Sequence, residues 1–552
     1  MDRRTVLAVF LSITVYYGWM VFYGPELPVD ELSVLEEGLI DPSTEKVALA
    51  EEPAPEPDPI PDAPLEERAF QPCTATAVLS SHGGGFEGLT LTDHLQPLTV
   101  QPIYSWMWAK VTGEAEGPWK PYGDEPGPVQ LQSEGGSAFY VGSGDVDGKP
   151  VAMTFVSNTP ERARLKGQVA PGVTVERSYQ VESVEPCLIQ IDTVWRNEGS
   201  RAHQEERFVA IKDVMDPASG GMMARYTSLR RPLAHAGDGL VIPELDESEP
   251  VQQVEGDPVW MGVADRYFGV LAMIQSSSSG DIQFHGDLET SETSVVYRKT
   301  GILEPGQTES VSMRAYLGPL QLETISIVES SFGDVVDLGW FAIFAYPLLW
   351  LLKACYSLLG SWGLAIIGLT MVVKGLFYPL TNTAFRSSQA MQTLQPKIKE
   401  LRETYKDDNE RMNREMMALF KENKVNPLGG CLPTLIQFPV WIALYNVLLS
   451  IVELYQTEFL YLKDLSVVDP YCVLPVTVVA MMMIQQRFTP TGNMDPTQAR
   501  MMKLMPLMFG FFFFLFPSGL VVYIFVNMAL SILQMWWIRR QFEEPATETA
   551  TA

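Results

Sequence analysis

A single lysine lies within a long apolar run at residues 361–381, SWGLAIIGLTMVVKGLFYPLT. An α-helix of this length rises about 30 Å, which is enough to cross the hydrocarbon core of a bilayer. A lone charge in such a span is unfavourable by about 2.5–3.5 kcal/mol on insertion scales and is a candidate functional residue. Alternatively, the Lys374 side chain snorkels: it extends along the helix so that its ammonium reaches the lipid headgroups at the nearer membrane surface. The segment alone leaves both interpretations open.

The other residue types that perform chemistry form no site with a recognisable spacing. The five histidines show no HExxH motif, and the five cysteines form no CxxC pair. Residues 144–149, GDVDGK, are one residue short of a phosphate loop, and a calcium loop begun at Asp145 would place Val156 where glutamate is needed. We therefore expect no cofactor, no metal and no enzymatic activity. Cys73 and Cys187 can form a disulfide if their segment is exported, and the sequence leaves that pairing open.

The charge is distributed unevenly along the chain. The formal net charge is −28, and residues 1–340 hold 22 basic and 52 acidic side chains, whereas residues 341–552 hold 17 and 15. The acidic first part would repel phosphates, so we expect no direct binding of nucleic acid. The second part is apolar, with its few charges clustered, as in a membrane protein.

The first 360 residues divide into four segments. Residues 1–24 predict an uncleaved signal-anchor helix, because the apolar run is long and no A-x-A site follows it. Residues 25–69 predict an extended acidic, proline-rich linker. Residues 70–319 show short alternating strands that predict a β-sandwich, with inward positions such as Val175, Ile191 and Met313. Residues 320–360 predict a connector and an interfacial amphipathic helix.

Residues 361–540 predict five membrane spans interrupted by a cytoplasmic helical hairpin at 382–428, and residues 541–552 predict a short acidic tail. With the first anchor this gives six transmembrane helices. The hairpin and the connector at 487–503 are rich in lysine and arginine, whereas 453–470 is acidic. The positive-inside rule then places both termini in the cytoplasm and the β domain outside the membrane.

Several separate blocks of this sequence, in order, resemble the YidC-type membrane protein insertases of the bacterial inner membrane. The blocks are AYLGP at 315–319, KGLFYPLT at 374–381, LQPKIKELRE at 394–403, NPLGGCLPTLIQFPVWIALYNVL at 426–448 and FPSGLVVY at 516–523. The resemblance covers nearly the whole chain. It implies a β-supersandwich in the periplasm and a helical bundle whose hydrophilic groove opens to the cytoplasm and to lipid.

The resemblance also implies a function and a site. It implies a non-enzymatic insertase and chaperone that accepts nascent membrane proteins and releases their apolar segments sideways into lipid, alone or with a Sec-type translocon. Lys374 stands where the family carries a positive groove residue, usually arginine, so the bidentate geometry of a guanidinium is lost. The candidate groove residues are Lys374, Thr370, Gln437, Gln485, Gln534 and Tyr523. The expected partners are nascent membrane proteins and membrane lipids, with the Sec translocon, the ribosome and signal-recognition targeting factors as further candidates.

Two other functions are compatible with parts of the chain. A secondary transporter or channel with an exported β domain would also carry a buried charge in its spans. The sequence shows neither evident inverted repeats nor several embedded carboxylates, which such proteins use. A carbohydrate-binding or carbohydrate-modifying β domain would need one anchor, whereas five further spans are predicted here. The groove glutamines and Thr370 have an alternative role as hydrogen-bonding contacts between helices.

Overall fold

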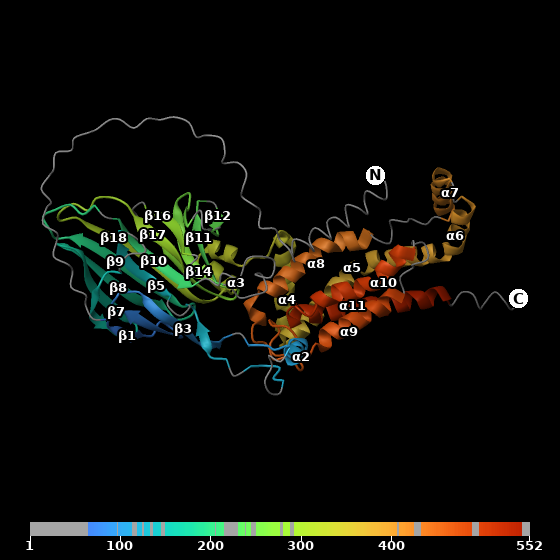
Figure 1. Ribbon diagram of the computed structural model, residues 1–552, viewed down its shortest axis with the longest axis horizontal. Coiled ribbons are helices and arrows are strands. Elements are labelled where there is room, and N and C mark those ends of the chain that lie inside the picture. Colours follow the sequence, from blue (N-terminus) through green and yellow to red (C-terminus); the bar gives the residue numbers. More distant parts are fainter. Residues whose placement is uncertain are drawn as a thin grey trace, which may run out of the picture.

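The computed structural model describes residues 65–543 except for 97, 113–118, 124–125, 133–135, 145–149, 205, 215–229, 238, 244, 246–249, 276–279, 288–291, 406–407, 424–431 and 488–495. The predicted anchor, most of the predicted linker, most of the GDVDGK loop and most of the acidic tail lie outside these residues. The described part is elongated, with the strands at one end and the long helices extending from them toward the other (Figure 1).

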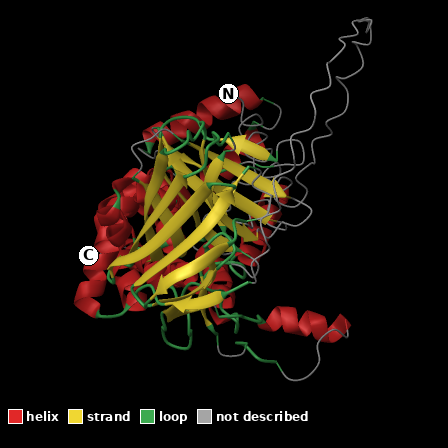
Figure 2. Cartoon of the chain, turned by 90° about the vertical axis from the view of Figure 1, so that its left-hand side faces the viewer, coloured by secondary structure: helices red, strands yellow, loops and turns green. Residues whose placement is uncertain are grey.

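The β domain is a sandwich of two antiparallel sheets, each with nine described strands. In the first sheet the order is β1-β2-β3-β5-β10-β17-β16-β13, with β4 paired to β3, and in the second it is β12-β11-β14-β15-β18-β9-β8-β7-β6. Figure 2 looks onto this domain, with the helices beyond the strands. The strands are β1 Glu67–Phe70, β2 Ala75–Ser80, β3 Phe86–Leu95, β4 Pro128–Gln130, β5 Ser137–Ser143, β6 Met153–Asn158, β7 Arg162–Ala170, β8 Val173–Ser183, β9 Leu188–Asn197, β10 Arg207–Val214, β11 Arg231–Ala236, β12 Gly239–Val241, β13 Val251–Gln253, β14 Pro258–Ala264, β15 Phe268–Ile274, β16 Asp281–Asp287, β17 Glu292–Lys299 and β18 Thr308–Pro319.

Side chains from both sheets meet in one core, which confirms the predicted sandwich. The Phe86 ring of β3 lies 4.8 Å from the Tyr179 ring of β8, centroid to centroid. Val175, Ile191 and Met313, predicted to face inward, are all buried. Their alternation with exposed neighbours follows from the two-residue period of a strand.

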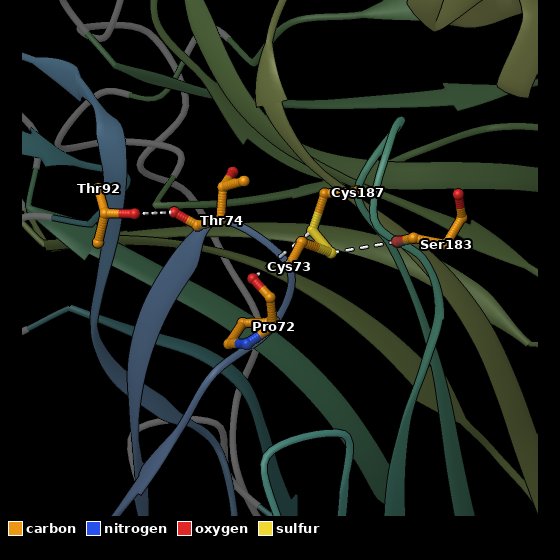
Figure 3. Close-up of a disulfide and its surroundings, with 6 residues drawn as sticks. All are labelled: Pro72, Cys73, Thr74, Thr92, Ser183 and Cys187. Atoms are coloured by element: carbon orange, nitrogen blue, oxygen red, sulfur yellow. Dashed lines mark hydrogen bonds between the residues drawn. A yellow bond between two sulfur atoms is a disulfide. The ribbon is translucent and has the colours of Figure 1, made fainter.

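A disulfide between Cys73 and Cys187 joins the β1–β2 turn to the β8–β9 turn, with the two Cα atoms 5.7 Å apart (Figure 3). The pairing that the sequence left open is therefore present in the structure. The bond closes a separation of 114 residues. Disulfides persist in oxidising compartments, so this one is compatible with export of the β domain.

The helical part begins with the connector α3 and η3 and continues through six long helices and the short helices of the hairpin. The helices are α2 Ile103–Thr112, α3 Leu322–Val328, η3 Ser330–Val335, α4 Ala342–Leu359, α5 Trp362–Thr393, α6 Gln395–Thr404, α7 Asn409–Glu422, α8 Leu432–Ser450, η4 Val452–Leu454, α9 Val473–Arg487, α10 Pro496–Phe512 and α11 Ser518–Glu543. The helix α2 is an excursion between β3 and β4 that contacts the helical part, since Ile103 N donates to Pro470 O at 2.9 Å.

The helix α5 extends well beyond the apolar run from which it was predicted. No proline or glycine follows Thr381 within α5, and the Thr381 hydroxyl donates to the Phe377 carbonyl of the same helix at 3.0 Å. The polar residues therefore continue the helix to Thr393 rather than starting the hairpin. The candidate span within α5 is Trp362–Ala384.

The hairpin α6–α7 projects at the end of the molecule away from the β domain (Figure 1). Its helices pack on each other through Leu394, Ile398 and Met416, which are buried, with Leu419 and Phe420 beside them. The predicted apolar seam is thereby used for self-packing. Asp408 caps α7 by accepting from Arg411 N at 3.0 Å.

The β domain and the bundle share a second apolar core. Trp260 of β14 is fully buried against Phe332 of η3, and its indole Nε1 donates to Ser331 Oγ at 2.9 Å. The same cluster continues into α4, α5, α8 and α11. The connector therefore joins the β domain to the bundle by packing as well as by covalent linkage.

Three described helices are long and apolar enough to cross a membrane: Ala342–Leu359 of α4, Trp362–Ala384 of α5 and Ser518–Ile538 of α11. The apolar parts of α8 and α9, Gln437–Ser450 and Val473–Arg487, are shorter. The first predicted span lies outside the described residues. The structure thus supports a helical membrane protein with a large β domain, while the count of six spans stays a prediction, as does an interfacial position for α4.

Candidate functional site

Lys374 lies close to the middle of the α5 span. Twelve residues separate it from Trp362 and ten from Ala384, which correspond to about 18 Å and about 15 Å along a helix. The candidate span extends three residues beyond Thr381, so Lys374 lies nearer to the middle of this span than to the middle of the apolar run 361–381.

The ammonium of Lys374 contacts the neighbouring helix α11. Its Nζ donates to Ser531 Oγ at 2.6 Å, and Ser531 Oγ donates in turn to Asn527 O at 2.8 Å. Among the described residues, no carboxylate forms an ion pair with Lys374. The charge is therefore held by a neutral hydroxyl.

Lys353, a lysine in the apolar helix α4, has a different environment. Its Nζ lies 2.8 Å from Glu453 Oε1 and 3.2 Å from Glu323 Oε1. Two carboxylates compensate this charge at the end of the bundle near the β domain. Among the described residues, Lys353 is thus paired with two carboxylates, whereas Lys374 is paired with none.

A pocket of about 660 Å³ opens between α5 and α11 around Lys374. Most of its wall is apolar or aromatic, and Lys374 and Gln534 are its two strongly polar side chains. The residues that line it are Met371, Lys374, Gly375, Tyr378, Leu530, Leu533, Gln534, Trp536 and Trp537. A cation in an apolar wall of this size suits a passing chain segment that carries both apolar and acidic side chains.

Gln534 forms a second polar contact between the two helices. Its Nε2 donates to Thr381 Oγ1 at 3.0 Å. The contacts Lys374–Ser531 and Thr381–Gln534 follow each other in the same direction along both helices, so α5 and α11 run parallel here. Hydrogen bonds between helices in a membrane fix the rotation of each helix about its axis.

The structure brings together two of the six sequence-predicted groove residues, Lys374 and Gln534. Thr370 is buried, and its hydroxyl donates to Ile366 O of its own helix at 2.6 Å. Tyr523 is buried in the shared apolar core. Gln437 lies in the first half of α8 and Gln485 near the end of α9, and neither lines this pocket.

Sequence reasoning missed Ser531, Tyr378 and the pair Trp536 and Trp537. Ser531 precedes Gln534 by three residues and so shares its face of α11, which is a signal that the sequence contains. Nothing in the sequence distinguishes Tyr378, Trp536 and Trp537 from aromatic residues elsewhere in the apolar helices. Within the ranges that the structure describes, no group of three or more histidine, cysteine or acidic side chains is arranged to hold a metal ion.

Comparison with known proteins covers both parts of the chain. Residues 128–351 match the family profile described as the YidC periplasmic domain, and residues 354–545 match the one described as 60Kd inner membrane protein. The membrane protein insertase YidC of Geobacter metallireducens is 32% identical over 556 residues, covering 98% of both chains. That of Geobacter sulfurreducens is 41% identical over 314 residues, covering 56% of this chain and 58% of the relative.

Among solved structures, a YidC insertase crystal structure with its first transmembrane domain resolved gives a TM-score of 0.36 at 16% identity, covering 85% of this chain and 92% of that one. The family assignment therefore rests on the sequence matches, of which one runs almost the full length of both proteins. On these matches, the chain belongs to the YidC family of membrane protein insertases.

Proposed function

We propose that this insertase receives polar termini or loops of nascent membrane proteins in the Lys374 pocket, from the cytoplasmic side, and that their apolar segments then leave sideways into lipid. The family is one of insertases and chaperones rather than enzymes. The observation that carries the proposal is the ammonium of Lys374 near the middle of the candidate span, with no carboxylate partner among the described residues, in a mainly apolar pocket.

The energetics favour acidic segments as the ones that Lys374 attracts. Two opposite unit charges 4 Å apart attract by about 4 kcal/mol at an effective dielectric constant of 20. Moving an unpaired polar group from water into hydrocarbon is unfavourable by about 2–7 kcal/mol. On insertion scales an aspartate at the centre of a span is unfavourable by about 2.5–3.5 kcal/mol, so the attraction to one lysine is of the size needed to offset the transfer of one acidic group. The apolar segment that follows needs no such help, because its transfer into lipid is favourable.

The apolar helix α9 packs against α11, one of the two helices that line the pocket, and its described part is short. The fifteen residues of α9 rise about 22 Å, less than the roughly 30 Å of a typical hydrocarbon core. A short span is accommodated in part by thinning of the bilayer around it. A thinner bilayer beside the pocket would shorten the hydrophobic path that a polar segment must cross.

The proposed topology follows from the charges and the fold together. The basic-rich hairpin α6–α7 and the end of α11 lie at the opposite end of the molecule from the β domain (Figure 1). We infer that this end faces the cytoplasm, that both chain termini are cytoplasmic, and that the β domain lies in the periplasm. Six spans in the inner membrane complete the proposal. The exposed charged faces of the hairpin are the proposed contact for the ribosome and targeting factors, and a Sec-type translocon is a further proposed partner.

The decisive experiment is depletion of the protein in its host and complementation with Lys374 variants. We expect Lys374→Arg to restore insertion of a small membrane protein with an acidic translocated tail, and Lys374→Ala to restore it poorly. Lys166→Ala removes one exposed charge from β7 of the periplasmic domain and serves as the control. Insertion at full rate with Lys374→Ala would show that the positive charge has no part in the mechanism.

A further inference from the structure

Ser531 is set up as a hydrogen-bond acceptor for Lys374. A serine hydroxyl has one hydrogen and two lone pairs. The hydrogen is directed to Asn527 O, 2.8 Å away on the same helix, so the lone pairs are left for the Lys374 ammonium at 2.6 Å. Ser531 is buried, and water therefore has little access to replace it.

The hydrogen bond to Ser531 fixes the position of the Lys374 ammonium. The four-carbon stem of lysine allows the ammonium to move by several ångströms toward either surface of the membrane. A bond to the neighbouring helix holds it at the level of Ser531 instead. Hydrogen bonds to charged groups are stronger than those between neutral groups, so this bond offsets part of the penalty for a charge at the centre of a span.

The neutrality of the partner matters as much as its position. A carboxylate here would neutralise the lysine, as Glu453 and Glu323 do for Lys353. A hydroxyl satisfies one donor and leaves the positive field intact. It also suits a lysine, whose compact ammonium needs single acceptors rather than the paired acceptors that match a guanidinium.

We propose that Ser531 is a positioning residue for Lys374, which holds the ammonium at mid-depth and gives way to the carboxylate of an incoming acidic segment. The proposal rests on the proposed function and deepens it, because it makes the selectivity for acidic segments depend on Ser531. A carboxylate is a stronger acceptor than a hydroxyl, so the exchange favours the substrate. A substrate without acidic residues in its translocated tail cannot replace Ser531 as the partner of Lys374, so its insertion should not depend on Ser531.

The test compares two substrates that differ in one respect. A small membrane protein with aspartates in its translocated tail is inserted beside the same protein with asparagines at those positions. Insertion rates are measured in proteoliposomes with the full-length wild-type protein, Ser531→Ala, Ser531→Thr, Lys374→Ala and a control. The control is Ser357→Ala on α4, which removes a hydroxyl that donates to Ala354 O of its own helix at 2.8 Å.

With Ser531→Ala we expect insertion of the aspartate substrate to slow by about tenfold, because the untethered ammonium would then occupy the level of Ser531 for only about a tenth of the time. The asparagine substrate should be inserted at the wild-type rate, which a general packing defect would not allow. Ser531→Thr keeps the hydroxyl and should retain the aspartate rate. Equal slowing of both substrates, or no slowing of either, would overturn the positioning role of Ser531.

A second measurement reports the position of the ammonium without insertion. A water-soluble amine-reactive ester is added to proteoliposomes, and modification of Lys374 is quantified by mass spectrometry. Release of the lysine by Ser531→Ala should raise its modification rate several-fold over the wild type and Ser357→Ala, and an unchanged rate would contradict the tether. If Lys374→Ala keeps the preference for the aspartate substrate, the proposed function fails. If Lys374→Ala loses that preference and Ser531→Ala keeps it, the role of Ser531 alone fails.

Discussion

The phenolic hydroxyl of Tyr455 donates to the carbonyl oxygen of Leu95 at 2.6 Å, across 360 residues of chain. Tyr455 belongs to the segment between α8 and α9, and Leu95 ends β3 of the exported domain. The Tyr455 ring also lies 5.1 Å from the ring of Tyr267 and 5.2 Å from that of Phe268, which begins β15. Gln456 Nε2 donates to the same Leu95 carbonyl at 2.8 Å. The β domain is thus held directly to the loop that links two helices of the bundle.

We predict that Tyr455→Ala loosens this attachment. The variant loses both the hydrogen bond to Leu95 and the ring contacts. Truncation of a fully buried aromatic residue lowers the free energy of unfolding by about 3–5 kcal/mol. We expect a smaller loss here, because Tyr455 is only half-buried. Tyr455→Phe loses only the hydrogen bond, so its loss of stability should be about 1 kcal/mol and no more than half that of Tyr455→Ala. Hydrogen exchange of the backbone amides in residues 451–472 is the measurement.

The control for this prediction is Tyr346→Ala, since Tyr346 is exposed on α4. It should leave exchange in 451–472 at the wild-type rate. Equal exchange in Tyr455→Ala and the wild type would mean that the packing of α3 and η3 holds the two parts together without this contact.

Much of the β domain follows from the sequence because a two-residue period reports which face of a strand is buried. Thr193 is polar and nevertheless buried on the core face of β9, as its position in the alternation predicts. Arg177 shares the core face of β8 and is fully buried, with Nε donating to Tyr179 OH at 2.8 Å. The alternation places Arg177 inward, but its partner Tyr179 depends on side-chain geometry that the pattern does not contain.

The site was less predictable for a physical reason. Lys374 is visible in the sequence because a charge contrasts with an apolar run. Its contact with Ser531 depends on how α5 and α11 are rotated about their axes, and these residues are 157 positions apart. Thr370 lies one turn from Lys374 yet directs its hydroxyl into its own helix, as threonines in membrane helices commonly do. Residue type alone does not tell whether a polar side chain contacts a neighbouring helix, as Lys374 does, or bonds its own helix, as Thr370 does.

The disulfide gives a second prediction, about stability and location together. Replacing Cys73 and Cys187 with serine should destabilise the β domain by about 2–4 kcal/mol, since the cross-link restricts the unfolded chain. Thermal unfolding of the purified protein is the measurement, and Cys355→Ser, which changes a free buried cysteine in α4, is the comparison for the bundle. When cells are denatured and treated with a thiol reagent, Cys73 and Cys187 should be labelled if a reductant was added first and stay unlabelled without it. Labelling without reduction would contradict an oxidised, exported pair.

The third prediction concerns Asp464, in the segment that Tyr455 begins. Its Oδ1 accepts from the backbone and hydroxyl of Ser466, both at 2.7 Å, and its Oδ2 is buried with no hydrogen-bond partner. Burial raises the pKa of the Asp464 carboxyl above its usual value, against the opposing effect of the Ser466 bonds. The native state therefore binds more protons than the unfolded state between the two pKa values, and stability decreases as the pH rises through that window.

We expect Asp464→Asn to raise the thermal unfolding temperature at pH 8, because asparagine can still accept from Ser466 and carries no charge to desolvate. For each unit by which burial raises the pKa of Asp464, the native wild type is destabilised by about 1.4 kcal/mol at high pH, where the carboxyl is charged. The gain should shrink as the pH falls toward 4, because the native carboxyl takes up its proton at a higher pH than the unfolded one. Asp337→Asn, at an exposed aspartate that accepts from Gly339 N at 2.8 Å, should show no such pH-dependent gain. A gain of equal size at pH 4 and pH 8 would mean that packing, and not ionisation of Asp464, separates the variant from the wild type.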